Sequence, residues 1–244
     1  MDKFNLYAAQ FLRFKEHFGA KGHKACIGCG VALAVRQAYK ALEENDVNIE
    51  KSTWTIPWEQ NIFLRTEDSA AKTKPSLLSI QKDGTKDGNI LHLCFDNEVT
   101  EGKITPDALS KKQPAVAAAS GYSYVATACP SHPFDFIQKV KNGCEANGSA
   151  FIHILCPCPV AWGINPRDTV RLGRMAVETR AFPLYEIVNG YYQITVSEPN
   201  PRPLKDYIKR QERFARWKTK DIEALQEDVN AAFHALEDKV NRSL

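Results

Sequence analysis

Short apolar runs alternate with turn-forming residues along the middle of the chain. They occupy residues 77–80, 90–95, 124–128 and 151–156. Runs of this length are typical of buried strands. Residues 133–142 form a helix candidate between the third and fourth runs, and Gly143 follows it, as glycines often follow helices. The order strand, helix, strand predicts a βαβ unit and a parallel sheet.

Helical periodicity marks three further segments. Residues 31–44 carry apolar side chains at helical spacing, namely Ala32, Val35, Tyr39 and Leu42. Another helix is predicted to open at Asn165-Pro166, because proline favours the first turn of a helix. After the proline-rich residues 199–203, one apolar stripe follows the helical period and consists of Ile222, Leu225, Val229, Ala232 and Leu236.

The strongest local signal is the sequence LYEIV-NG-YYQITV at residues 184–196. Asn189-Gly190 is the pair that a type I′ turn requires, so these residues predict a β-hairpin. The whole pattern predicts an α/β fold with a mostly parallel sheet, flanking helices, this hairpin and a helical C-terminal extension. We expect one domain over residues 1–198 and the extension over residues 199–244.

Composition and charge narrow the possible classes of protein and its location in the cell. The 244 residues are 43% hydrophobic and 25% charged, enough for a sizeable core, and a net charge of +3 gives no case for nucleic-acid binding. Charges interrupt every apolar run in residues 1–19, so no signal peptide and no membrane span is expected. Seven cysteines without an export signal favour a reducing, cytoplasmic location. Residues 207–217 and the stripe at 222–236 predict apolar area exposed on a monomer, and therefore a subunit contact.

Two cysteine pairs are the candidate chemistry. Cys26 and Cys29 flank Gly28 just before a predicted helix, and two thiolates at this spacing can hold one metal ion or two corners of an iron–sulfur cube. Cys156 and Cys158 stand at the end of a predicted strand, where ligands gather in α/β sheets. Together the pairs form a complete four-ligand metal set. Burial as small apolar side chains is the alternative, and a zinc-binding interaction module is another.

Several motifs in a shared order carry a resemblance to a known family. They are GHKACIGCG at 22–30, WTIPW at 54–58, LCFDNE at 93–98, CPVAW at 158–162, AVET at 176–179 and FPLYE at 182–186. In this order they resemble the β subunits of pyruvate and related 2-oxoacid:ferredoxin oxidoreductases, over most of residues 20–218.

The resemblance implies an α/β thiamine-diphosphate-binding fold, Mg²⁺ on the diphosphate and a nearby [4Fe-4S] cluster. It implies oxidative decarboxylation of a 2-oxoacid with CoA to an acyl-CoA, with electrons passed to ferredoxin or a similar acceptor, within a complex of several subunits. Three cysteines match family cluster ligands: Cys26, Cys29 and Cys158. The cofactor positions matched are Asn97 and the Val99 carbonyl for Mg²⁺, with Gly28 and Gly30 in the loop near the cofactor.

The sequence also departs from the family pattern at two places. Residues 48–53 lack the family's remaining cluster cysteine, so Cys156 is predicted to take its place. Asp87-Gly88 runs almost directly into the strand at 90–95, which leaves no room for the helix that normally follows a metal-binding aspartate. Because Mg²⁺ needs oxygen ligands on several sides, thiamine diphosphate is expected to bind weakly. The chain is then either a β subunit with a compact site or a β-like subunit that has lost thiamine chemistry and serves to hold a cluster or the assembly.

Overall fold

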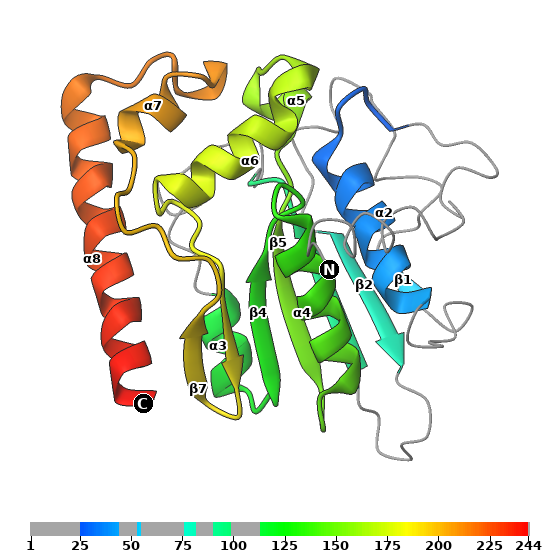
Figure 1. Ribbon diagram of the computed structural model, residues 1–244. Coiled ribbons are helices and arrows are strands. Elements are labelled where there is room, and N and C mark those ends of the chain that lie inside the picture. The colour runs from blue at the N-terminus through cyan, green and yellow to red at the C-terminus, as the bar shows by residue number, and fades with distance from the viewer. Residues whose placement is uncertain (1–24, 44–52, 55–75, 82–89, 99–112, 244) are drawn as a thin grey trace, which may run out of the picture.

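A seven-stranded sheet forms the centre of the computed structural model, which describes residues 25–43, 53–54, 76–81, 90–98 and 113–243 (Figure 1). Its strands run in the order β1-β2-β3-β5-β4-β6-β7. Their bounds are β1 Thr53–Trp54, β2 Ser76–Gln81, β3 Ile90–Asp96, β4 Tyr124–Ala128, β5 Ala150–Leu155, β6 Tyr185–Val188 and β7 Tyr191–Ile194. Residues 1–24, Asp87-Gly88 and Val99 lie outside the described residues.

The parallel part of this sheet is its centre. β5 pairs in parallel with β3 on one side and β4 on the other, whereas β1, β2, β6 and β7 are added in antiparallel pairs. Helix α4, Pro133–Glu145, connects β4 to β5, so the predicted βαβ unit is confirmed. The α/β class with flanking helices, a hairpin and a C-terminal helix is confirmed as well.

Alternation along the central strands explains how the sheet is covered. Leu91, Leu93 and Phe95 of β3 share one core cluster with α4 and with α2, Gly30–Glu43. Strand residues between them point to the other face, because successive side chains alternate. Helix α3, Gln113–Ala119, contributes Ala117 to an apolar cluster with Val125 of β4 and Ile187 of β6. The sheet therefore lies between two helical layers, and its second face also carries the buried polar residues of β3 and β5.

The predicted hairpin is confirmed. β6 and β7 pair antiparallel with Val188 opposite Tyr191, and the two residues between them have positive φ angles, 51° at Asn189 and 88° at Gly190. A type I′ turn needs positive φ at both central residues, which asparagine and glycine tolerate. The hairpin extends the sheet beyond β4 through β6.

Short helices cover the end of the sheet where the parallel strands finish (Figure 1). They are α5 Pro159–Trp162, α6 Thr169–Glu178 and α7 Leu204–Ile208, with 3-10 turns at Pro166–Asp168 and Glu212–Phe214. The helix expected to open at Asn165-Pro166 thus starts as a 3-10 turn, in which the Asn165 side chain accepts a hydrogen bond from the Arg167 amide. The three short helices and the turn at Glu212–Phe214 share one apolar cluster with Leu155 at the end of β5.

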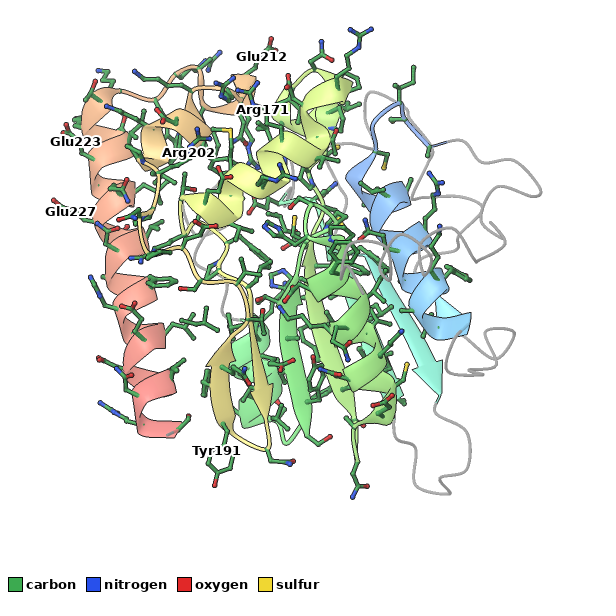
Figure 2. All side chains as sticks on the ribbon, in the orientation of Figure 1. Arg171, Tyr191, Arg202, Glu212, Glu223 and Glu227 are labelled. Atoms are coloured by element: carbon green, nitrogen blue, oxygen red, sulfur yellow. The ribbon has the colours of Figure 1, made fainter. Side chains whose placement is uncertain are left out.

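The C-terminal helix α8, Thr219–Ser243, runs alongside β7 (Figure 1). Its buried residues are Leu225, Val229, Phe233 and Leu236, while Glu223 and Glu227 project away from the sheet (Figure 2). The expectation that this stripe is exposed on a monomer is therefore wrong, because the chain covers the stripe itself. Ala232, a predicted member of the stripe, is exposed, and Phe233 is buried in its place. The Arg180 guanidinium lies 4.0 Å from the centre of the Phe233 ring. Among the described helices, none is both long and apolar enough to cross a membrane.

Candidate functional site

Two loops that carry the cysteine pairs meet at the end of the parallel strands. The Gly30 amide donates a hydrogen bond to the Pro157 carbonyl at 3.1 Å. The Thr169 hydroxyl, at the start of α6, donates to the Gly28 carbonyl at 2.6 Å. Residues more than 120 positions apart are thereby joined, once backbone to backbone and once through the Thr169 side chain, which brings the first cysteine pair to the second.

The glycines of the first loop allow this close approach. A side chain at Gly30 would place its Cβ 2.4 Å from the Pro157 carbonyl oxygen. At Gly28, where φ is +71°, a Cβ would lie 2.4 Å from the Pro166 carbonyl oxygen. Both distances are too short for any real contact, so only glycine fits at either position. The resemblance matched these glycines to a cofactor loop, and here their backbone groups also bond to the protein itself.

Cys26 and Cys158 lie close enough to Cys29 to affect the pKa of its thiol. Burial raises the pKa of Cys29 to about 11, the amides of Ala32 and Val31 oppose that rise, and neighbouring Cys158 and Cys26 add to it. Burial also raises the pKa of Cys158, against the amides of Ala161 and Val160, and Cys26 again adds to it. These three thiols are the three that match the family's cluster ligands.

Two of these sulfur atoms lie at helix N-termini. Cys158 is the N-cap of α5 and its sulfur accepts a hydrogen bond from the Ala161 amide at 3.4 Å. Cys29 directly precedes α2, and its sulfur accepts hydrogen bonds from backbone amides in the first turn of that helix. Helix N-termini stabilise negative charge, so both positions favour a thiolate once a metal replaces the proton.

Cys156 occupies a different environment from Cys158. Its side chain is fully buried in the cluster that α2 and α4 form with the sheet, and its thiol lies 3.6 Å from the Ile154 carbonyl. Burial raises the pKa of Cys156, with Cys129 and then Cys29 as its strongest cysteine neighbours. β5 ends at Leu155, so neither Cys156 nor Cys158 lies within the strand. Cys156 therefore adjoins the site from the core side, next to Cys29.

The spacing of these side chains bears on which metal they can hold. Within the described ranges, no three histidine, cysteine or acidic side chains are arranged around one point as ligands of a single ion would be. Two sulfurs on one tetrahedral zinc, each about 2.3 Å from the metal, stand within about 4 Å of each other. A four-iron cube is held at its corners, so its ligand sulfurs lie farther apart. A three-ligand set around one ion is therefore not formed by the described residues.

A second candidate site is the turn after β3, formed by Asp96, Asn97 and Glu98. Asp96 accepts a hydrogen bond from the Glu98 amide at 2.7 Å, and its other oxygen lies 2.8 Å from the buried ring of His153. The Asn97 carbonyl accepts a hydrogen bond from the indole of Trp162 at 2.8 Å. The turn is therefore tied to β5 and to α5, which begins after Cys158.

Glu98 completes this turn with an ion pair that the sequence did not reveal. Its φ is +59°, an uncommon value for a residue other than glycine. Its carboxylate lies 2.7 Å from the Arg213 guanidinium, and both side chains are 1% exposed. The two residues are 115 positions apart, and neither periodicity nor motif spacing connects them. Two acidic side chains of the turn are thus paired within the chain, while Asn97 stands between them as the Mg²⁺ candidate that the resemblance names.

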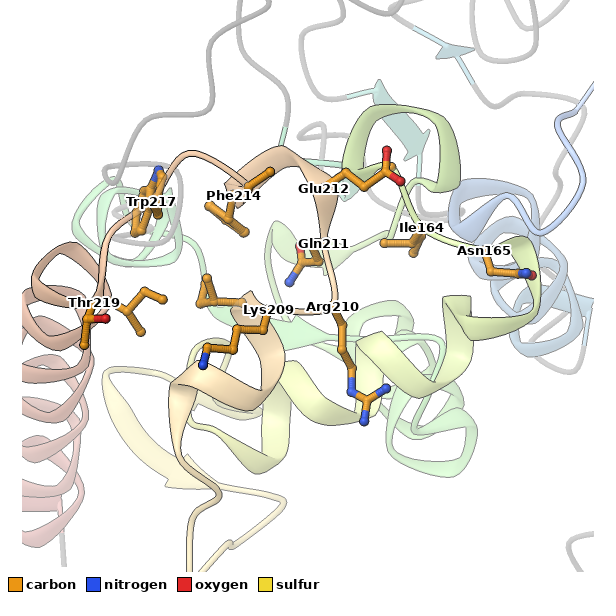
Figure 3. Close-up of a pocket in the computed structure, with 13 residues that line it drawn as sticks. Ile164, Asn165, Lys209, Arg210, Gln211, Glu212, Phe214, Trp217 and Thr219 are labelled. Atoms are coloured by element: carbon orange, nitrogen blue, oxygen red, sulfur yellow. The ribbon is translucent and has the colours of Figure 1, made fainter.

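A cavity of about 430 Å³ lies beside this site, between the turn after α5 and residues 208–222 (Figure 3). Ile164, Phe214 and Trp217 form part of its apolar lining, and Lys209 and Arg210 add positive charge. Arg213 does not line it, because that side chain points inward to Glu98. The cysteines do not line it either, so the cavity and the cysteine site are separate features.

Comparison with known proteins gives the chain its family. No family model matches it. Pyruvate synthase subunit PorB of Methanothermobacter thermautotrophicus is 30% identical over 282 residues, which cover 91% of this chain and 98% of that protein. PorB of Methanocaldococcus jannaschii is 29% identical, over 88% of this chain and 95% of that protein. Ketoisovalerate oxidoreductase subunit VorB of Pyrococcus furiosus is 26% identical, over 88% and 91%.

The matches and the α/β fold define a subunit of an oxidoreductase complex. The chain belongs to the β subunits of 2-oxoacid:ferredoxin oxidoreductases, the family of PorB and VorB. The aligned region of 282 positions is longer than the 244 residues of this chain, so this relative contains segments that the chain lacks. The predicted family is confirmed.

Proposed function

We propose that this β subunit carries electrons through a [4Fe-4S] cluster held by Cys26, Cys29, Cys158 and Cys156. The complex would oxidise a 2-oxoacid with CoA to an acyl-CoA and pass electrons to ferredoxin or a similar acceptor. The observation that carries the proposal is the direct contact between two distant loops, Gly30 to Pro157 and Thr169 to Gly28, which carry Cys26, Cys29 and Cys158. A bound cluster would supply one-electron transfer.

The protein's own residues have defined roles in this proposal. Gly28 and Gly30 let the two loops touch, and the first turns of α2 and α5 direct amides at Cys29 and Cys158. Those amides offset the negative charge that four thiolates bring to a partly buried site. Cys156 would be the fourth ligand, reached from the core side by turning its thiol away from the Ile154 carbonyl.

The diphosphate half of the family's chemistry has weaker support. Asp96 and Glu98 are both paired with cationic or hydrogen-bonding partners of the chain, and Asn97 alone cannot surround an Mg²⁺ ion. The segments that the chain lacks relative to PorB are a second reason to expect few ligands. We therefore propose that holding the cluster within the complex is this chain's main part, and that it binds thiamine diphosphate weakly by itself.

Anaerobic purification with iron, sulfide, zinc and thiamine-diphosphate analysis of one sample tests the proposal. We expect about four iron and four sulfide per chain, as a four-iron cube contains. Single alanine variants at each of the four cysteines should lose most of that iron, and Cys144→Ala, a half-buried cysteine of the core, is the matched control. Zinc in place of iron would favour the zinc module instead. Full iron content in Cys156→Ala would remove that residue from the ligand set.

A further inference from the structure

Arg213 is a buried arginine that connects the two candidate sites. Its guanidinium makes a 2.7 Å ion pair with Glu98 of the turn after β3, and its Nε donates a hydrogen bond to the Gln211 side chain at 2.6 Å. Charged side chains are rarely buried unless they are paired. An arginine with 1% side-chain exposure is therefore a specific feature of the fold, and the sequence pattern did not predict it.

The same guanidinium packs on the helix that follows Cys158. Its central carbon lies 3.9 Å from the ring centre of Trp162 and 4.6 Å from that of Phe214. Trp162 is the last residue of α5, a single turn that starts immediately after Cys158. The indole of Trp162 in turn donates to the Asn97 carbonyl. Arg213 thus contacts one residue of the turn and one residue of the cysteine helix directly.

We propose that Arg213 is a positioning residue whose buried charge, balanced by Glu98, tunes the reduction potential of the cluster beside Cys158. This inference rests on the proposed function. A reduced cluster carries one more negative charge than an oxidised one, so a nearby fixed cation raises the potential and a nearby anion lowers it. The pair is shielded from water, which preserves the effect of each charge.

Contacts beside the cysteine place the ion pair close to it. The Trp162 amide donates a hydrogen bond to the Cys158 carbonyl at 2.9 Å, so the ring on which the Arg213 guanidinium packs lies one turn from that cysteine. Glu98 and Arg213 act in opposite directions on the buried Tyr207 beside them, whose pKa burial raises. The effect of each charge of the pair therefore extends to its neighbours.

Potentiometric titration of the anaerobically purified protein, followed by electron paramagnetic resonance, tests the inference. Arg213→Met should lower the reduction potential, Glu98→Gln should raise it, and the double variant should return close to wild type. Opposite signs distinguish a charge effect from structural damage. Arg213→Lys, which keeps the charge, should stay nearer to wild type than Arg213→Met and covers the case in which the methionine variant fails to fold. Arg202→Met removes a more exposed arginine paired with Glu178 and should leave the potential unchanged.

Two results would overturn the inference in different ways. If the wild-type protein holds a cluster but Arg213→Met, Glu98→Gln and the double variant all keep its reduction potential, Arg213 has no tuning role. The same conclusion follows if all three variants shift the potential in one direction. In both cases the proposed function still stands. If the wild-type protein holds no cluster, the proposed function fails and this inference fails with it.

Discussion

The ends of β5 and β3 are neighbours in the sheet, and they are stabilised in contrasting ways. After β5, the loop with Cys156 and Cys158 is held by backbone contact with the glycine loop, and its thiols lie near those of Cys26 and Cys29. After β3, Asp96 and Glu98 are held by side-chain pairs with His153 and Arg213. The Cys156 amide joins the two ends by donating to the Asp96 carbonyl at 2.7 Å.

The contrast teaches which part of the family's chemistry this chain supports best. Backbone contacts stabilise the loop after β5, so its cysteine side chains stay available to a ligand. Where charged side chains hold the turn, they are already engaged, and a metal ion would have to compete with partners inside the protein. A cysteine site supported by glycines and a turn held by side-chain pairs support the proposal that the chain holds a cluster and binds thiamine diphosphate weakly.

The largest effect is expected at Gly28, where a close backbone contact is combined with a positive φ angle. Gly28→Ala combines a φ of +71° with a Cβ 2.4 Å from the Pro166 carbonyl. We expect a loss of about 3 kcal/mol or more in the free energy of unfolding, from left-handed strain plus overpacking. Iron content should fall with it. Gly121→Ala is the matched control, because its φ is +87° in open space and only the strain term of about 1 kcal/mol applies. Equal losses in both variants would show that the loops do not touch as described.

Local chemistry made much of the fold predictable from sequence. The apolar runs marked β2, β3, β4 and β5 because buried strands need continuous apolar sequence, and Asn189-Gly190 marked the hairpin because few other pairs adopt its turn. The antiparallel joining of β6 to β4 was not predictable, since pairing between distant strands leaves no local signal. The burial of Phe233 in place of Ala232 depended on which face β7 presents to α8.

The candidate site likewise has one part that the sequence predicted and one part that it did not. Cysteine spacing and the family motifs pointed to the loops at Cys26 and Cys158, and the structure brings those loops together. The ion pair of Glu98 with Arg213 gave no such signal, because the two residues lie 115 positions apart and no periodicity or motif spacing connects them. Long-range pairing of single charged residues needs the fold before it can be seen.

A second prediction concerns the pair of Asp96 with His153 at the end of β3. His153→Leu leaves a largely buried carboxylate with fewer partners, and we expect a loss of about 2–3 kcal/mol in unfolding free energy. Iron content should stay at the wild-type level, since the side-chain pair supports the turn rather than the cysteine loops. Adding Asp96→Asn should recover part of the stability, because the amide keeps the bond from the Glu98 amide without a buried charge. Loss of the cluster in folded His153→Leu protein would contradict the separation of the two regions.

A third prediction concerns the affinity for thiamine diphosphate at the turn after β3, measured by titration in the presence of Mg²⁺. We expect this chain by itself to bind at least tenfold more weakly than PorB of Methanothermobacter thermautotrophicus measured in the same way. Tenfold corresponds to about 1.4 kcal/mol. Titration calorimetry on both proteins provides the comparison. Micromolar binding that Asn97→Ala abolishes would instead demonstrate a working compact site at this turn.

The smallest effect concerns Cys129, which follows β4 and provides a third strand end for comparison. Its thiol is fully buried and accepts a hydrogen bond from the Ser131 hydroxyl at 3.1 Å. Burial raises its pKa from 9.0 to about 11, and the Ser131 hydroxyl opposes that rise. Because the folded-state pKa is the higher one, the stabilising contribution is complete below pH 9 and is lost as the pH rises toward 11.

In Cys129→Ala this part of the pH dependence should disappear. Between pH 8 and pH 10 the wild-type free energy of unfolding should fall by about 1 kcal/mol more than that of the variant, as a pKa difference of about two units implies. Denaturant unfolding of the metal-free proteins at several pH values measures the difference, and the iron content of the loaded variant should equal that of wild type. Parallel pH curves would mean that the Cys129 thiol titrates alike in the folded and unfolded chains. A loss of iron would make Cys129 a member of the cysteine site, and the three strand ends could then no longer be assigned separate roles.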